Sequence, residues 1–105
     1  MAQFDIYQNP NPKTRSSYPF IIDMQNSLVD ELSTRIVSPL IDYKKFKNQE
    51  IQKLTPKVTY ENQELLILIP QITSMPANKL KDPVGSLVHL RDEIIAALDF
   101  AIIGI

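Results

Sequence analysis

The chain has 105 residues, which is enough for one domain with its own hydrophobic core and too few for two. Hydrophobic residues make up 44% of the sequence and the formal net charge is −1, so the chain lacks the marked basic excess of most nucleic-acid-binding modules. It has no cysteine, which excludes a disulfide framework, a thiolate nucleophile and a zinc–thiolate site.

Two local features bear on location and partners. The N-terminal residues 1–7 alternate between apolar and polar and contain no long apolar run, so we expect neither a signal peptide nor a membrane anchor. A cytoplasmic protein is the simplest interpretation. The cluster of Lys44, Lys45 and Lys47 is small and is more typical of a solvated loop than of a phosphate-binding surface.

The first half of the chain predicts short strands separated by turns. Residues 3–7 alternate as a strand with Phe4 and Ile6 on one face, and two prolines in 9–12 end it. A second strand covers 18–24. In the polar loop 25–34, Leu28 and Val29 are adjacent, so we expect at least one of them to be exposed.

The second half predicts more strands and a final helix. We expect a third strand over 35–41, broken or bent at Pro39, and a loop or one short helix over 42–53. Residues 57–60 and 64–69 predict a hairpin around 61–63, and 71–74 an extended segment. Ser86 is a suitable N-cap for the last helix. The pattern predicts one domain, mainly β: an antiparallel barrel or half-barrel over about 1–85 and a helix over about 86–103.

The C-terminal stretch 87–105 carries apolar residues on two sides of the predicted helix. At about 100° per residue, one stripe should face the core, and it comprises Leu87, Val88, Leu90, Ile94, Ile95, Leu98, Ala101, Ile102 and Ile105. The opposite side is polar through Asp99 but continues with Phe100 and Ile103. This apolar tip predicts either a partner-binding site or a homodimer interface, and periodicity does not choose between them.

Catalytic and cofactor signals are weak. His89 lies near Asp92 and Glu93, an arrangement more typical of a helix surface contact than of a general base. One histidine with scattered carboxylates is not a metal-ligand set, and the two glycines, Gly85 and Gly104, do not form a phosphate loop. We therefore expect no cofactor and no metal. For Arg35 two roles are open, facing a phosphate-binding groove or pairing with an acid, and pairing is the commoner role for an arginine in a strand.

Four segments in order resemble the CcdB family of toxins from type II toxin–antitoxin modules. They are Phe20-Ile21-Ile22-Asp23-Met24-Gln25, Arg35-Ile36-Val37-Ser38-Pro39-Leu40, Thr73-Ser74-Met75-Pro76 and the chain end Ile103-Gly104-Ile105. The likeness runs from Gln3 to the C-terminus. It implies a homodimer of an SH3-like antiparallel barrel with a C-terminal helix, and a protein that is not an enzyme.

The resemblance also implies a target and a regulator. CcdB-like proteins bind the DNA gyrase A subunit and trap its complex with cleaved DNA. A cognate antitoxin, CcdA-like with a disordered C-terminal half, neutralises them, and the two proteins together repress their own operon. Operator DNA is then contacted only through the antitoxin, and no membrane is involved. The resemblance assigns no antitoxin-contact residues in this chain.

The residues implied for gyrase binding are carried over by position. Gly104 and Ile105 match the family's chain end, and Leu28 and Val29 match an apolar pair in the loop after the second strand. Two positions depart: Ile103 stands where the family has tryptophan, and Asp99 where it has asparagine. Isoleucine cannot stack on an arginine, which forfeits about 0.5–2 kcal/mol per contact. Two alternatives therefore stay open: a MazF-like endoribonuclease on the same barrel, with Arg35 as its candidate residue, and a non-toxic relic that still binds antitoxin.

Overall fold

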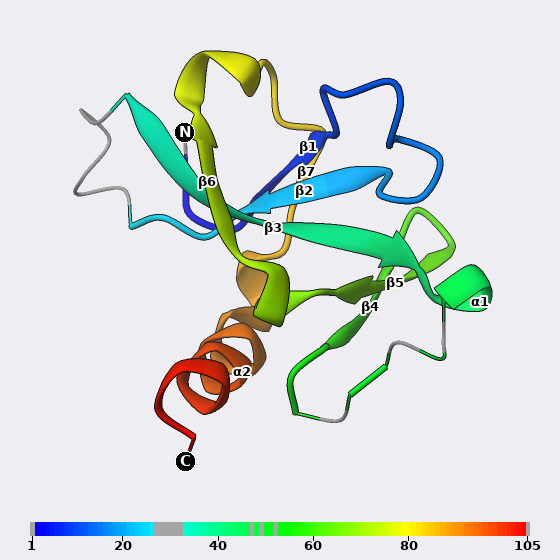
Figure 1. Ribbon diagram of the computed structural model, residues 1–105, viewed down its shortest axis with the longest axis vertical. Helices are drawn as coiled ribbons and strands as arrows, with labels where there is room; N and C mark the ends of the chain where they lie inside the picture. The colour runs from blue at the N-terminus through cyan, green and yellow to red at the C-terminus, as the bar shows by residue number, and fades with distance from the viewer. Residues whose placement is uncertain (1, 27–32, 47, 49, 52, 105) are drawn as a thin grey trace.

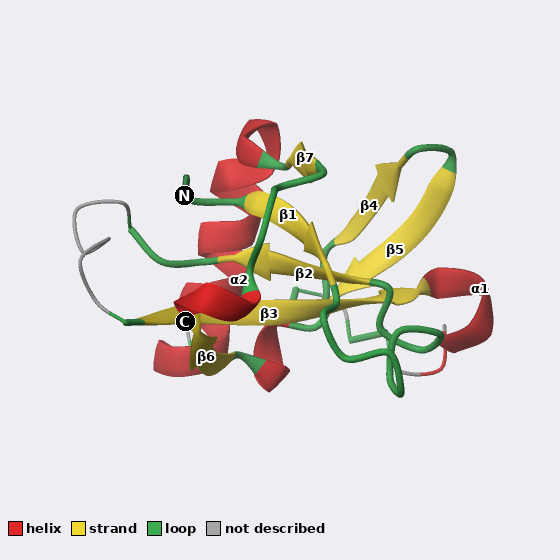
Figure 2. Ribbon diagram, turned by 90° about the horizontal axis from the view of Figure 1, so that it is seen from above, coloured by secondary structure: helices red, strands yellow, loops and turns green. Residues whose placement is uncertain are grey.

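One antiparallel sheet and a C-terminal helix form the fold (Figures 1 and 2). The computed structural model describes residues 2–26, 33–46, 48, 50–51 and 53–104. The sheet has the order β4-β5-β3-β2-β1-β7, and β6 pairs with β3. Its strands are β1 (Asp5–Gln8), β2 (Phe20–Asp23), β3 (Thr34–Asp42), β4 (Lys57–Tyr60), β5 (Gln63–Ile67), β6 (Thr73–Pro76) and β7 (Gly85–Ser86). The sheet curls into a half-barrel, so the predicted fold class is confirmed.

Helical elements connect and close the sheet. The α-helices are α1 (Tyr43–Phe46) and α2 (Arg91–Ile103), and the 3-10 helices are η3 (Ile69–Gln71), η4 (Ala77–Lys79) and η5 (Val88–Leu90). The first of these, α1, is the short helix that the sequence left as one of two alternatives for this region. Among the described residues, no helix combines the length and the apolar character needed to cross a membrane.

The long strand β3 joins the two parts of the sheet. It pairs with β2 on one side, while on the other its first half pairs with β6 and its second half with β5. Pro39 does not break it, because its missing N–H falls where β3 changes partner. There the Leu68 N–H donates to the Pro39 carbonyl at 2.9 Å, and the Ser38 hydroxyl donates to the Leu68 carbonyl at 2.8 Å.

The β4–β5 hairpin is tighter than the sequence indicates. Glu61 and Asn62 both have positive φ, at 50° and 64°, which is the backbone of a two-residue hairpin turn. Gln63 therefore belongs to β5 and pairs with Tyr60, so the predicted three-residue loop was one residue too long. Strand β6 spans Thr73–Pro76, two residues later at each end than the predicted segment 71–74, because Gln71 belongs to η3.

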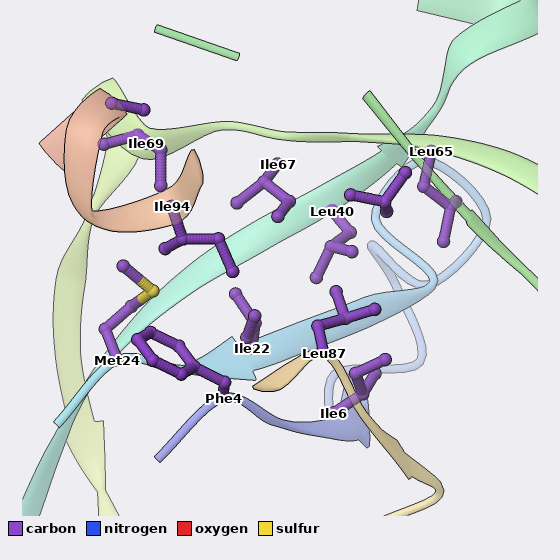
Figure 3. Packing of buried hydrophobic residues seen from close by; sticks show 12 residues of the cluster. Phe4, Ile6, Ile22, Met24, Leu40, Leu65, Ile67, Ile69, Leu87 and Ile94 are labelled. Carbon is purple, nitrogen blue, oxygen red and sulfur yellow. The ribbon is translucent and has the colours of Figure 1, made fainter. Parts of the chain in front are cut away.

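The main core lies between the sheet and α2 (Figure 3). Phe4 and Ile6 both contribute to it, which confirms that they share a face. Phe4 is buried with a φ of 70°, an unfavourable conformation for a bulky residue, and its N–H donates to the Asp23 carbonyl at 2.6 Å. Tyr7 points to the other face, where it belongs to a second cluster with Ile21, Val37 and Leu80.

The final helix begins later than predicted. The Ser86 hydroxyl accepts a hydrogen bond from the Val88 N–H at 3.2 Å, but Ser86 precedes Leu87, the N-cap of η5, and α2 begins only at Arg91. Leu90 stands at the N-cap of α2 and makes no side-chain capping bond. The prediction of Ser86 as the cap of the main helix was therefore wrong, because a 3-10 turn intervenes before the α-helical hydrogen bonds start.

Tyr60 links the β4–β5 hairpin to the segment just before β7, at the opposite end of the sheet. Its hydroxyl donates to the Val84 carbonyl, and its ring packs edge-to-face on Phe20 with centroids 5.3 Å apart. Burial, and then the charge of Glu61, raise the pKa of Tyr60 above its usual value of 10.0, so the hydroxyl stays protonated and remains a donor. Gly85 leaves room for this ring, since a Cβ there would lie 2.6 Å from the Tyr60 Cε1 atom.

The substitution Gly85→Ala should lower the free energy of unfolding by about 1–3 kcal/mol, because the added methyl forces the Tyr60 ring out of place. Urea unfolding of the single variants and of the double variant with Tyr60→Leu would measure this. The smaller leucine should relieve the clash, so the alanine should cost less in that background. An equal cost in both backgrounds would show that Tyr60 is not the obstacle.

Candidate functional site

The helix α2 and the end of η5 dock on the core through residues up to Leu98. Ile94 and Ala97 are buried, and three further side chains pack at the edge of the core: Leu90, Ile95 and Leu98. The last turn passes beyond the sheet toward the C-terminus (Figure 1). The predicted core-facing stripe was therefore wrong at its ends, where Val88, Ala101 and Ile102 are exposed. Helical periodicity gives a direction around the axis but not the point at which the opposing sheet stops.

The tip of the helix is an exposed apolar end. Ile102 and Ile103 are 70% and 62% exposed, and Asp99 lies exposed one turn before Ile103. Gly104 ends the helix with a φ of 81°, and its N–H donates to the Phe100 carbonyl at 2.9 Å. A left-handed residue at this position favours glycine. Apart from its chain neighbours, no atom of the described residues lies within 4 Å of where a Gly104 Cβ would be.

Phe100 forms a side wall beside this tip. It is half-buried, and the Lys53 ammonium lies 5.8 Å from the centre of its ring. The two residues border a groove of about 500 Å³ between α2 and the loop before β4, completed by Pro56, Glu93, Ala96 and Ala97. The sequence placed Phe100 with Ile103 on one exposed face, but the structure turns Phe100 toward Lys53 and leaves Ile103 exposed.

Three residues implied by the family resemblance lie outside the described residues. These are Leu28 and Val29 of the loop after β2, and Ile105 at the chain end. The structure thus places Asp99, Ile103 and Gly104 together on the last turn of α2.

Arg35 is fully buried and pairs with Asp23. Its Nη2 and Nε atoms lie 2.6 and 3.1 Å from the Asp23 Oδ2 atom, and both side chains are 0% exposed. The other carboxylate oxygen accepts the Gln25 N–H at 3.0 Å, and the Gln25 side chain accepts the Ile36 N–H at 3.1 Å. Of the two roles considered for Arg35, the structure shows pairing with an acid.

The remaining catalytic candidates are dispersed. His89 is exposed on η5. Over the part of the chain that the structure describes, no group of three or more His, Cys, Asp or Glu side chains is placed to hold a metal ion.

The fold and the tip together define a small antiparallel half-barrel with a C-terminal helix whose last turn is free of the core. A family model described as CcdB protein matches residues 3–104. The chain belongs to the CcdB family, which makes it a toxin of a toxin–antitoxin module.

Replacing one member of the buried ion pair should leave the other charge without its partner. We expect Arg35→Met to lower the free energy of unfolding by about 3–5 kcal/mol. Arg91→Met is the matched control, because Arg91 is an exposed arginine whose Asp92 pair, at 3.7 Å, should contribute less than about 1 kcal/mol. Urea unfolding measures both, and equal losses would contradict a dominant role for the buried pair.

Proposed function

We propose that this chain is a non-enzymatic toxin that binds the DNA gyrase A subunit through the end of α2 and traps the complex of gyrase with cleaved DNA. In this proposal a cognate antitoxin neutralises it, and the two together repress their operon. Family membership supports the proposal, and one structural observation carries it. The last turn of α2 presents Ile102 and Ile103 to solvent and ends in an unobstructed glycine.

The exposed tip has the properties of a recognition surface. Apolar side chains left in water at a chain end contribute nothing to the core and are stabilised when a partner covers them. The adjoining groove between Phe100 and Pro56 gives a concave neighbour to the convex tip. Because Gly104 has no side chain, a partner's backbone can approach the end of the helix closely.

A homodimer is part of the proposal. Ile102 is the most exposed large hydrophobic side chain among the described residues, and it is separated around the helix from Ile103. We infer that a second copy of the chain covers the Ile102 side of α2 while the Ile103 side remains for gyrase. Two tips would then lie side by side in the dimer, as suits a target that is itself a pair of A subunits.

Arg35, the candidate residue of the endoribonuclease alternative, is not placed to act on a substrate. Stabilising the charge of a phosphoryl transition state needs a cation that can reach the substrate. Arg35 is 0% exposed and its guanidinium is bound to Asp23. No observation in the described residues favours RNA cleavage over gyrase binding.

We expect the last three residues to be required for killing but not for folding. We expect deletion of Ile103, Gly104 and Ile105 to abolish toxicity, because it removes the proposed gyrase contact. Dimer mass by sedimentation and affinity for antitoxin should stay near those of the full chain, since Ile94 and Ala97 anchor the helix upstream. Cell viability, double-strand breaks and the SOS response after induction would measure toxicity.

The control for this deletion is Val84→Ser, which removes another exposed apolar side chain at a distance from the tip. It should leave killing unchanged. If the truncated protein kills as well as the full chain, gyrase binding through the tip is wrong.

Ile103→Trp should strengthen gyrase binding. A tryptophan restores a ring that can stack on a guanidinium, which corresponds to about a 2- to 30-fold gain for 0.5–2 kcal/mol.

Gly104→Glu should weaken binding by placing bulk and charge at the close contact, whereas Gly104→Asn adds less bulk and tolerates the left-handed backbone. Surface-immobilised gyrase A fragment would give the affinities. An unchanged affinity in Ile103→Trp together with no killing by the native chain would favour the non-toxic relic.

A further inference from the structure

A second concave site lies on the face of the sheet that Tyr7 occupies, away from α2. Its volume is about 320 Å³, which is within the range of small-molecule pockets. Tyr7, which is buried, lies at the sheet side of this pocket, and the walls come from the loop after β1 and from the end of η4 with the segment that follows it. The polar and charged lining consists of Gln8, Asn9, Arg15, Lys79, Lys81 and Asp82.

The charges in this pocket are unbalanced. Arg15, Lys79 and Lys81 line it against one carboxylate, Asp82, which leaves a net charge of about +2. Within the described part of the chain, no Asp or Glu side chain lies within ion-pairing distance of any of the three cations. Like charges gathered around one cavity repel each other, and an anion inside it would offset that repulsion.

The loop wall of the pocket is braced from within. Asn9 is buried, and its side-chain amide donates to the Thr14 hydroxyl and to the Tyr18 carbonyl, both at 2.9 Å. Arg15 donates from Nε to the Asn9 carbonyl at 2.8 Å, which fixes the guanidinium against the loop. A cation held in place in this way loses little further freedom when it binds an anion.

The other wall is anchored to the sheet by Leu80, which lies between its two lysines, and by Val84, which follows them. Leu80, between Lys79 and Lys81, is buried in the cluster that contains Tyr7. The Leu80 N–H donates to the Ala77 carbonyl at 3.1 Å, and the Val84 N–H donates to the Ile6 carbonyl at 2.8 Å. The backbone of both walls is therefore held in place before any ligand binds, while the side chains of Lys79 and Lys81 are exposed.

We propose that this pocket binds a dianionic phosphate monoester. The net charge of about +2 matches a phosphate monoester, which carries about −1.5 to −2 at pH 7, better than a single carboxylate or one phosphodiester. A guanidinium supplies a planar pair of donors for two phosphate oxygens, and lysine ammonium groups supply point charges. The site does not use the helix tip and is independent of the proposed function.

The test uses the full-length protein and three probes: inorganic phosphate, a nucleoside 5′-monophosphate and a trinucleotide that carries only diester phosphates. Backbone amide NMR shifts should move at Tyr7, Lys81 and Val84 with the monoester. The double variant Lys79→Gln/Lys81→Gln should weaken binding at least 10-fold. The matched control is Lys44→Gln/Lys45→Gln, which removes the same charge from exposed residues of α1 and should bind as the native chain does.

Comparing the probes shows whether the pocket recognises phosphate alone or a larger molecule that carries it. Binding of inorganic phosphate and of the monophosphate with equal affinity indicates recognition of the phosphate alone, and tighter binding of the monophosphate indicates a larger ligand. The proposal is overturned if the trinucleotide binds as tightly as the monoester. It is also overturned if the two double variants lose affinity equally, since the effect would then be one of overall charge.

Discussion

The buried pair of Asp23 and Arg35 is the constraint on which the sheet depends. Burying a charged group away from water costs free energy unless the group is paired and hydrogen-bonded. Here the Asp23 carboxylate binds the Arg35 guanidinium and the Gln25 N–H. The pair joins the end of β2 to the start of β3 on either side of residues 27–32. Because β3 is the strand that pairs with β2, β5 and β6, fixing its start also fixes the register of the strands around it.

The separation of stability from recognition follows from this arrangement. The sheet and the part of α2 up to Leu98 form a core around residues such as Ile22, Leu40 and Ile94 (Figure 3). The last turn of the helix contributes nothing to that core. A terminal turn outside the core can therefore carry exposed apolar residues such as Ile103, and substitutions there should cost the fold little stability.

The molecule presents two surfaces of different chemistry. The tip of α2 is apolar with the exposed acid Asp99 beside it, whereas the pocket near Tyr7 carries three cations and one acid. Since Tyr7 lies in the second hydrophobic cluster, on the face of the sheet away from α2, a ligand in the pocket and a protein on the tip need not compete for space. The overall charge of −1 does not reveal the local excess of cations at the pocket.

The sequence by itself determined the local elements and the family. Alternation placed Phe4 and Ile6 on one face, composition excluded cysteine chemistry, and four ordered segments indicated the half-barrel with its helix. The tertiary structure alone decided what depends on distant partners. Arg35 proved to be bound to Asp23, twelve residues away, and Phe100 turned to Lys53. Ile102 is exposed because the helix is longer than the sheet beneath it. Periodicity reports which side chains share a direction, but burial depends on whether another element lies in that direction, which no local pattern encodes.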